Sequence, residues 1–235
     1  MFQVPSAGVF FVTCCFFFKD CSNSFYYFEK YQDLPTRGAR TVEQFSINGS
    51  LFLAFANNRG DTEGFKTESF IYKLNISSRK FLLYQTIDTT GAWNIKYFTI
   101  ADKNYLAVAS NRNGTRHKLN SVIYQWNGHQ FVAFQIIPTR GLPGFNYFKI
   151  LQDPFLAVTN GAANSVNYKW KNNHFEKFQE IGTERAVAST AIVLNKETFI
   201  AFATMATPDS TPLYSSGQET VLSNCRLFKR MEHMM

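Results

Sequence analysis

The chain has 235 residues, 17% of them aromatic, and its 24 Lys and Arg outnumber its 17 Asp and Glu to give a net charge of +7. This length allows one large all-β domain or two small ones, and the aromatic content argues against disorder. The charges are scattered and no basic helix or stacking motif occurs, so nucleic acid is excluded as an expected partner. No apolar run is long enough for a transmembrane helix.

Residues 1–24 contain the apolar run 8–18, which has the length of a signal-peptide core. Residues 1–7 contain no Lys or Arg, and no small-x-small cleavage site follows the run. The segment is therefore either a signal peptide or a hydrophobic strand of an incomplete first repeat, and both interpretations stay open.

From residue 25 the sequence repeats itself about every 50 residues, which indicates a repeat architecture. Each repeat begins with an aromatic strand that ends in Gln, then a turn, a second strand, a strand of alternating large and small residues, a variable polar loop and a fourth strand. The aromatic strands are Phe28–Gln32, Phe81–Gln85, Phe131–Gln135 and Phe175–Gln179. We place the repeats at residues 28–74, 81–126, 131–170 and 175–204, within a unit that covers residues 25–204.

The large–small strand is apolar on both faces, as in Tyr105–Ser110, where Leu106 and Val108 alternate with Ala107 and Ala109. A strand of this kind is buried on both faces. Bulky side chains on one face and methyl groups on the other let successive sheets stack, and we expect this strand to lie innermost in a radial array of sheets. The other copies are Phe52–Asn57, Phe155–Asn160 and Phe199–Thr204.

The variable loops 57–68, 111–120 and 161–164 all follow the large–small strand. We expect them on one face of the assembly, where a repeat scaffold usually carries binding specificity, although they could equally be tolerated insertions. The fourth repeat decays: its last strand, expected at residues 219–222, is poorly marked, and residues 205–235 are predicted to be a degenerate last blade and a tail.

The pattern F-x-x-[YF]-Q-x-[LI]-x-T-x-G-A, followed by [YF]-L-A-V-A-[NS] and S-[VF]-I-Y-x-[WL], resembles the EAR repeat, also called the EPTP or epitempin repeat. The second repeat, Phe81–Trp126, carries it most completely. Such repeats occur in the leucine-rich glioma-inactivated proteins and in the thrombospondin-type laminin G domain and EAR repeat protein. The resemblance implies an all-β fold, a β-propeller of four-stranded antiparallel blades, in secreted or cell-surface proteins.

In this family the propeller usually has seven blades and acts as a protein-interaction module, not as an enzyme. The present sequence offers about four repeats. Three explanations are open: a part of a seven-bladed ring, blades that are completed between chains, or a smaller closed ring. The first of these is favoured.

Three N-x-S/T sequons lie in predicted turns, where a secreted protein could carry glycans: Asn48, Asn75 and Asn113. The four cysteines show no metal-type spacing. If a signal peptide removes Cys14 and Cys15, a disulfide between Cys21 and Cys225 could join the two ends of the chain. Unpaired thiols are the alternative.

No catalytic chemistry is expected. The four histidines are not spaced as metal ligands, and no nucleophile elbow, P-loop or dinucleotide motif occurs. We therefore predict no catalytic residue, no metal site and no cofactor.

The sequence as a whole predicts an extracellular protein-interaction module for cell adhesion or receptor signalling, with an extracellular or cell-surface protein as its partner. The alternative is a lectin-like propeller that binds acidic glycans, which the net positive charge would suit. A homo-oligomer is expected if the ring of one chain is incomplete.

Overall fold

A computed structural model describes residues 28–62, 64–115, 118–183, 185–195, 197–205 and 224–229. The chain divides into two units, Met1–Asp33 and Leu34–Met235. In the first unit, the described residues 28–33 form no helix or strand, and Lys30 Nζ lies 3.1 Å from Asp33 Oδ2 in an exposed ion pair. All the architecture below belongs to the second unit.

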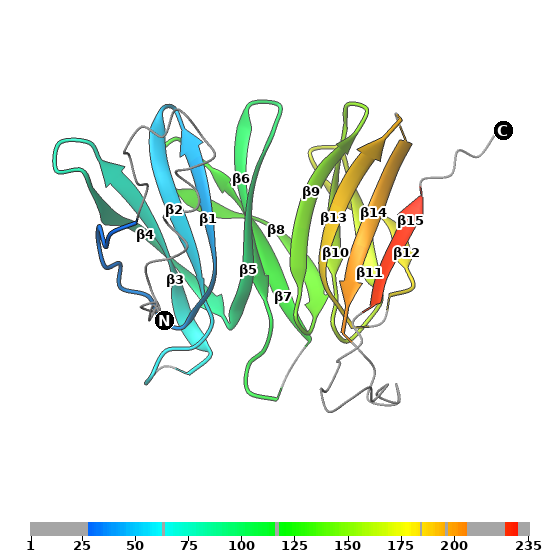
Figure 1. Cartoon of the computed structure of the whole chain (residues 1–235), viewed down its shortest axis with the longest axis horizontal. Helices are drawn as coiled ribbons and strands as arrows, with labels where there is room; N and C mark the ends of the chain where they lie inside the picture. Colours follow the sequence, from blue (N-terminus) through cyan, green and yellow to red (C-terminus); the bar gives the residue numbers. More distant parts are fainter. Residues whose placement is uncertain are drawn as a thin grey trace, which may run out of the picture. The chain divides into compact units, whose positions relative to one another are not determined.

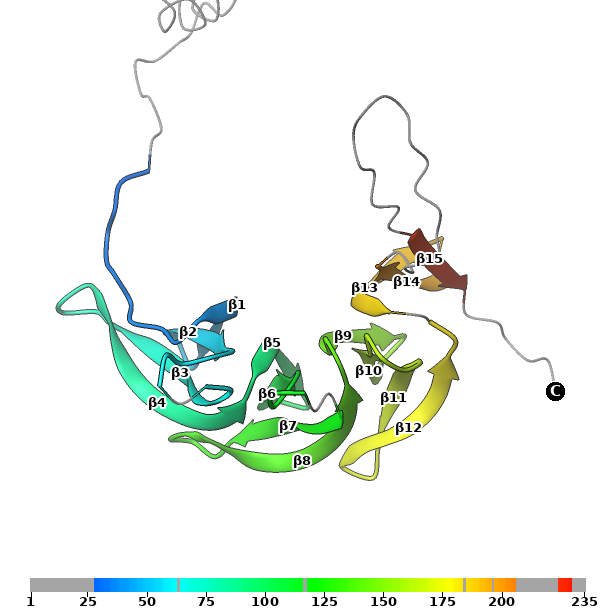
Figure 2. The same ribbon diagram turned by 90° about the horizontal axis from the view of Figure 1, so that it is seen from below.

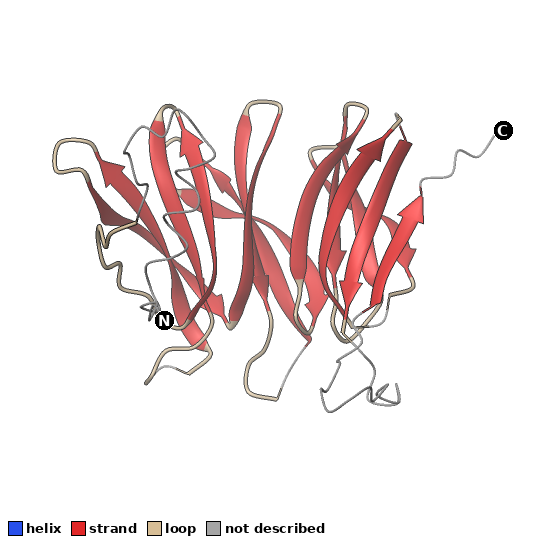
Figure 3. Cartoon of the chain, viewed as in Figure 1, coloured by secondary structure: helices blue, strands red, loops and turns tan. Residues whose placement is uncertain are grey.

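The second unit is built from antiparallel strands (Figure 3). The strands are β1 (Ala39–Ile47), β2 (Ser50–Asn57), β3 (Lys66–Asn75), β4 (Lys80–Thr90), β5 (Ala92–Ile100), β6 (Lys103–Ser110), β7 (Lys118–Trp126), β8 (Phe131–Arg140), β9 (Gly144–Ile150), β10 (Asp153–Thr159), β11 (Ser165–Lys171), β12 (His174–Ile181), β13 (Ala186–Leu194), β14 (Glu197–Thr204) and β15 (Asn224–Lys229). Within the described residues, no helix is long and apolar enough to cross a membrane.

The strands form four sheets in which strand order follows chain order (Figure 1). Sheet 1 is β1-β2-β3-β4, sheet 2 is β5-β6-β7-β8, and sheet 3 contains β9, β10, β11 and β12 in the same sequence. Sheet 4 has three strands among the described residues, β13-β14-β15. Each sheet is a meander, because every pair of neighbouring strands is antiparallel and consecutive in the chain.

The sheets are offset by one strand from the sequence repeats. The aromatic strand that opens each repeat is the last strand of the preceding sheet, as β4, β8 and β12 show. Each repeat therefore contributes its first strand to one sheet and the remaining strands to the next, so the covalent repeat itself joins neighbouring sheets.

The large–small strand is second in its sheet, which makes the expectation that it lies innermost wrong. The first strands β1, β5, β9 and β13 occupy the inner side instead (Figure 2). The reason is physical: a first strand is a sheet edge with one row of unpaired backbone groups, whereas the second strand is paired on both sides. The alternation of large and small apolar residues requires only that both faces of the strand are buried. Any strand that is paired on both sides within a stacked sheet can meet this requirement.

The predicted face-to-face packing of large on small residues is confirmed. Ala54 and Ala56 of sheet 1 share a buried cluster with Leu106 and Val108 of sheet 2. The pattern continues between sheets 2 and 3, where Ala107 and Ala109 pack with Leu156 and Val158, and between sheets 3 and 4, where Ala157 packs with Ile200 and Phe202. One face of each sheet thus fits into the opposite face of the next.

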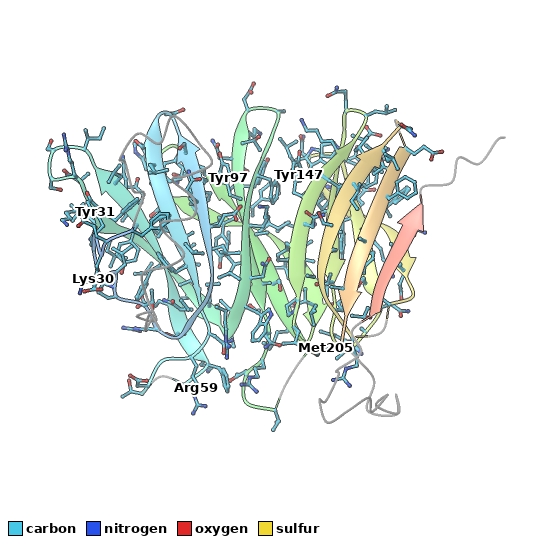
Figure 4. All side chains as sticks on the ribbon, viewed as in Figure 1. Lys30, Tyr31, Arg59, Tyr97, Tyr147 and Met205 are labelled. Carbon is cyan, nitrogen blue, oxygen red and sulfur yellow. The ribbon has the colours of Figure 1, made fainter. Side chains whose placement is uncertain are left out.

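Aromatic pairs reinforce the same interfaces. Phe45 of β1 stacks on Tyr97 of β5 with ring centroids 4.5 Å apart, and Phe98 of β5 stacks on Tyr147 of β9 at 4.7 Å. The Tyr147 hydroxyl donates to the Thr99 carbonyl at 3.0 Å, so its polar end is satisfied. Figure 4 labels Tyr97 and Tyr147. Burial raises the pKa of both tyrosines, which keeps them protonated donors.

A glutamine in the outer strand fastens sheet 1 to sheet 2, and an equivalent glutamine fastens sheet 2 to sheet 3. Gln85 Nε2 donates to the Phe131 carbonyl at 2.8 Å, and the Phe131 N–H donates to Gln85 Oε1 at 2.9 Å. Gln135 makes the same two bonds to Phe175, at 2.8 and 2.9 Å. We call this two-bond arrangement the glutamine clamp. It binds only backbone atoms of the neighbouring strand.

One further expectation differs from the structure. The aromatic strand predicted at Phe28–Gln32 is absent: residues 28–32 lie in no strand, and Phe28 is fully exposed. Residues 205–235 were expected to hold a degenerate last blade and a tail, and within this range Asn224–Lys229 forms β15, which pairs with β14. The strand expected at residues 219–222 lies outside the described residues.

Candidate binding surface

One end of the stack gathers all the variable loops. The β2–β3, β6–β7 and β10–β11 connections lie there, together with the β4–β5, β8–β9 and β12–β13 turns, because strands alternate in direction (Figure 1). We call this the loop end. The prediction that the variable loops share one face is therefore confirmed.

The loops are anchored at equivalent points. The first residue after the large–small strand donates its N–H to the carbonyl of the turn before the inner strand. The bonds are Asn58 to Gly38 at 3.1 Å, Asn111 to Gly91 at 3.0 Å, Gly161 to Gly141 at 2.5 Å and Met205 to Arg185 at 3.1 Å. These turns have left-handed backbones, and at Gly91 (φ 55°) an added Cβ would lie 2.4 Å from the Arg112 carbonyl oxygen. The glycine is thus required by close approach as well as by backbone conformation.

A network of buried hydroxyl groups lies at the base of the loops, where the strands end. Ser121 Oγ accepts the Ser110 N–H at 2.9 Å and lies 2.7 Å from Thr139 Oγ1, which also reaches the Leu119 carbonyl at 3.2 Å. Sheet 1 repeats this arrangement with Ser69 and Thr89, and sheet 3 with Ser165 and Thr183. The recurring Ser and Thr of the sequence motif therefore rigidify the base of the loops and not only their turns.

The loop end is strongly cationic. Strand termini and loops there contribute eight basic residues of the described chain, whereas four acidic ones, Asp61, Glu68, Asp88 and Glu180, offset them. The basic residues are Arg37, Arg40, Arg59, Lys66, Arg112, Lys118, Arg140 and Arg185. An excess of this size at one end of the molecule attracts anionic partners.

Aromatic rings hold several of these arginines in place. Phe65 in the β2–β3 loop contacts both Arg59 and Arg112, whose guanidinium carbons are 5.3 and 4.6 Å from its ring centroid (Figure 4 labels Arg59), and we call these three residues the Phe65 cluster. Arg40 covers Trp93 at 4.9 Å. A guanidinium stacked on a ring keeps its N–H groups available in a fixed plane. The Phe65 cluster also connects the β2–β3 loop of sheet 1 to the β6–β7 loop of sheet 2.

A depression of about 380 Å³ lies at the loop-end termini of β3 and β4. Arg37 and Lys66 line it together with Glu68, Asp88 and three threonines. Arg37 Nη1 lies 3.5 Å from Glu68 Oε2. The two basic and two acidic side chains that line the depression balance each other, so the uncompensated positive charge of the loop end lies on the neighbouring loops.

The predicted glycosylation residues fall at both ends. Asn48 lies exposed in the β1–β2 turn and Asn75 exposed at the end of β3, where its Oδ1 accepts the Ser78 N–H at 2.8 Å. Asn113 is half-buried in the β6–β7 loop at the loop end. Their modification stays a prediction.

The predicted disulfide also stays a prediction. Cys21 lies outside the described residues, and Cys225 lies in β15 without a described side chain.

No metal centre forms in the part of the chain that the structure describes, where no three His, Cys, Asp or Glu side chains come together. His129 and His174 are exposed next to the turns that precede β8 and β12, while His117 and His233 are not described. What sequence reasoning missed is the arginine set. Arg37 and Arg140 recur at equivalent turn positions of two repeats, each followed by Gly, and this recurrence was the signal that could have found the set.

Antiparallel sheets that stack face to face, each joined to the next through its outer strand, define the chain as a β-propeller protein. The EPTP domain profile matches residues 28–75, 80–127 and 130–171. The chain belongs to this family, whose repeats are the EAR repeats.

Among curated relatives, the thrombospondin-type laminin G domain and EAR repeat-containing protein of Homo sapiens is 34% identical over 167 residues, which cover 68% of this chain and 24% of the relative. Its Mus musculus counterpart is 36% identical over 135 residues, covering 57% of this chain and 20% of the relative. The chain thus spans less than a quarter of the length of either relative.

Among solved structures, an α-L-arabinofuranosidase from Lactobacillus brevis matches with a TM-score of 0.48 and 12% identity, over 80% of this chain and 71% of that chain. At this level of similarity nothing about the chemistry of the present chain is taken from it.

Proposed function

We propose that the chain is an extracellular protein-interaction module, for cell adhesion or receptor signalling, whose loop end binds an acidic surface of a protein partner. The observation that carries the proposal is the Phe65 cluster, in which the guanidinium groups of Arg59 and Arg112 both lie over the Phe65 ring. Its two guanidinium groups are oriented before binding, so little side-chain entropy is lost when they pair with carboxylates.

The proposed role is binding without catalysis. Arginine is the commonest charged residue at the loop end, and a guanidinium group binds anions through charge-assisted hydrogen bonds and does not serve as a general acid or base. Their chemistry is recognition of anions.

An extracellular location is supported by the exposed sequons at Asn48 and Asn75 and by the word "thrombospondin-type" in the name of the relatives. We expect the full chain, expressed in mammalian cells, to reach the medium and to gain mobility after deglycosidase treatment. Asn75→Gln should remove part of that shift. Retention inside the cell with no shift would contradict the proposal.

A second candidate function, binding of acidic glycans, is favoured by the same arginines, because guanidinium pairs with sulfate as well as with protein carboxylate. The decisive experiment measures binding of the labelled chain to cultured cells before and after treatment with trypsin or heparinase. Loss after trypsin with retention after heparinase supports a protein partner. Loss after heparinase supports the glycan and overturns the protein proposal.

Paired variants locate the surface. Arg59→Gln with Arg112→Gln should weaken cell binding about tenfold or more, since two charge-assisted contacts are lost. Arg79→Gln with Lys80→Gln removes the same charge at the exposed β3–β4 turn of the opposite end and should leave binding within about twofold, because only distant screened charge changes. Equal effects of both pairs would show that net charge, not the loop end, governs binding.

A further inference from the structure

Sheet 4 is incomplete within the described chain. Sheets 1 to 3 each have an outer fourth strand, β4, β8 or β12, whereas sheet 4 ends at β15. Among the described residues no strand pairs with the second edge of β15, so this edge presents backbone N–H and C=O groups that another extended segment can pair with.

A glutamine clamp is also left open beside sheet 4. Gln179 of β12 occupies the position of Gln85 and Gln135, each of which binds the backbone of the first aromatic residue in the next sheet's outer strand. The Gln179 side chain is exposed and makes no hydrogen bond to the described residues. Its expected ligand is therefore the backbone of a fourth strand in sheet 4.

The outward face of sheet 4 is apolar and uncovered. Ile192 is 44% exposed, whereas Phe98 at the same position of sheet 2 is 3% exposed. Leu194 is 58% exposed against 6% for the equivalent Ile100. The side chains that sheets 1 to 3 bury under the following sheet are thus left open to solvent here.

The chain itself contains a segment that fits this position. Residues 28–32 read Phe-Glu-Lys-Tyr-Gln, and the outer-strand residues 175–179 read Phe-Glu-Lys-Phe-Gln. The first segment nevertheless lies in no strand, and its Phe28 is fully exposed. An outer-strand sequence outside any sheet and a sheet without an outer strand are complementary.

We propose that two copies of this chain associate head to tail, with residues 28–32 of one copy added to β15 of the other as its fourth strand. Gln179 then clamps the backbone of Phe28 from the second copy. The bulky face of sheet 1 in the second copy, with Val42 54% exposed, covers Ile192 and Leu194 as Leu106 and Val108 cover Ala54 and Ala56. The contact joins two different surfaces, so repetition leads either to a closed ring or to an open filament.

The test is light scattering coupled to size exclusion on the full chain over a range of concentrations. We expect a concentration-dependent species above the monomer. Phe28→Asp and Gln179→Ala should each weaken association about tenfold or more, because the first introduces a charge into an apolar contact and the second removes two hydrogen bonds. Ile76→Asp and Gln130→Ala are the matched controls. They change exposed turn residues at the end of the sheets opposite the loop end and should leave association unchanged.

Amide hydrogen exchange and a synthetic peptide identify the strand. Amides of residues 28–32 and 224–229 should become protected together as the oligomer forms, and a peptide of residues 28–36 should bind the chain and dissociate the oligomer. A chain that stays monomeric at every concentration overturns the proposal. If the amides of residues 28–32 and 224–229 are nevertheless protected in that monomer, the two segments pair within one chain. Association that ignores both Phe28→Asp and Gln179→Ala overturns it as well. Neither Phe28→Asp nor Gln179→Ala changes the loop end. A negative result for self-association can therefore be distinguished from a failure of the proposed protein-binding function.

Discussion

The interface between sheets 2 and 3 and the outward face of sheet 4 use the same strand positions in different surroundings. In the first, Phe98 stacks on Tyr147 and Ala107 is fully buried. In the second, the equivalent Ile192 and Ala201 are exposed and half-buried. The comparison shows that a sheet of this chain buries its apolar residues only through its neighbour, as expected when stability is a sum of interfaces.

The largest difference in stability is expected when the stacked aromatic side chain of Phe98 is truncated. Phe98→Ala should lower the free energy of unfolding by about 3–5 kcal/mol, because a buried aromatic ring leaves a cavity. Ile192→Ala, its equivalent in sheet 4, should cost less than about 1 kcal/mol in the monomer, since solvent already reaches it. Urea unfolding at a concentration where the chain is monomeric checks both values. Equal losses would mean that sheet 4 is covered as fully as sheet 2.

A smaller effect is expected from overpacking of the alanine face. Ala107→Leu should cost about 1–3 kcal/mol, because Leu156 and Val158 of the next sheet already fill the space above it. Ala201→Leu, at the same strand position of sheet 4, changes a half-buried residue with no following sheet over it among the described residues, and should cost clearly less. Thermal melting of both variants tests the pair, and an Ala107→Leu protein that melts like the unsubstituted chain would contradict the packing argument.

The smallest effect concerns the glutamine clamp. Gln135→Ala should cost about 1–2 kcal/mol, because two hydrogen bonds to the Phe175 backbone are lost. Gln179→Ala should leave the stability of the monomer unchanged, because this side chain has no such partner in the described chain. Chemical denaturation of the monomer separates the two. A clear loss for Gln179→Ala would show that its clamp is already closed within one chain.

The strands and their mutual packing could be predicted from the sequence because the relevant information is local. Alternation of Leu106 and Val108 with Ala107 and Ala109 specifies two faces, and repetition along the chain specifies what each face meets. The order of strands within a sheet is not encoded in that alternation, and so the large–small strand was wrongly expected at the inner edge.

The polar chemistry was harder to predict. The Gln that closes each aromatic strand served to align the repeats, but its bonds run to backbone atoms of a strand 40 or 46 residues away. The cationic loop end likewise results from arginines that are far apart in sequence and meet only because their turns share one end. The tail strand β15 carries no repeat signal, and its pairing with β14 reflects an available edge.

The clamp has an evolutionary consequence. Because Gln85 and Gln135 bind only a carbonyl and an N–H, the contact imposes no demand on the side chain that it meets. When one repeat is duplicated or deleted in the gene, the glutamine clamps to the repeats on either side of the change can still form. Proteins assembled this way can vary in the number of their segments while each individual segment diverges freely in sequence.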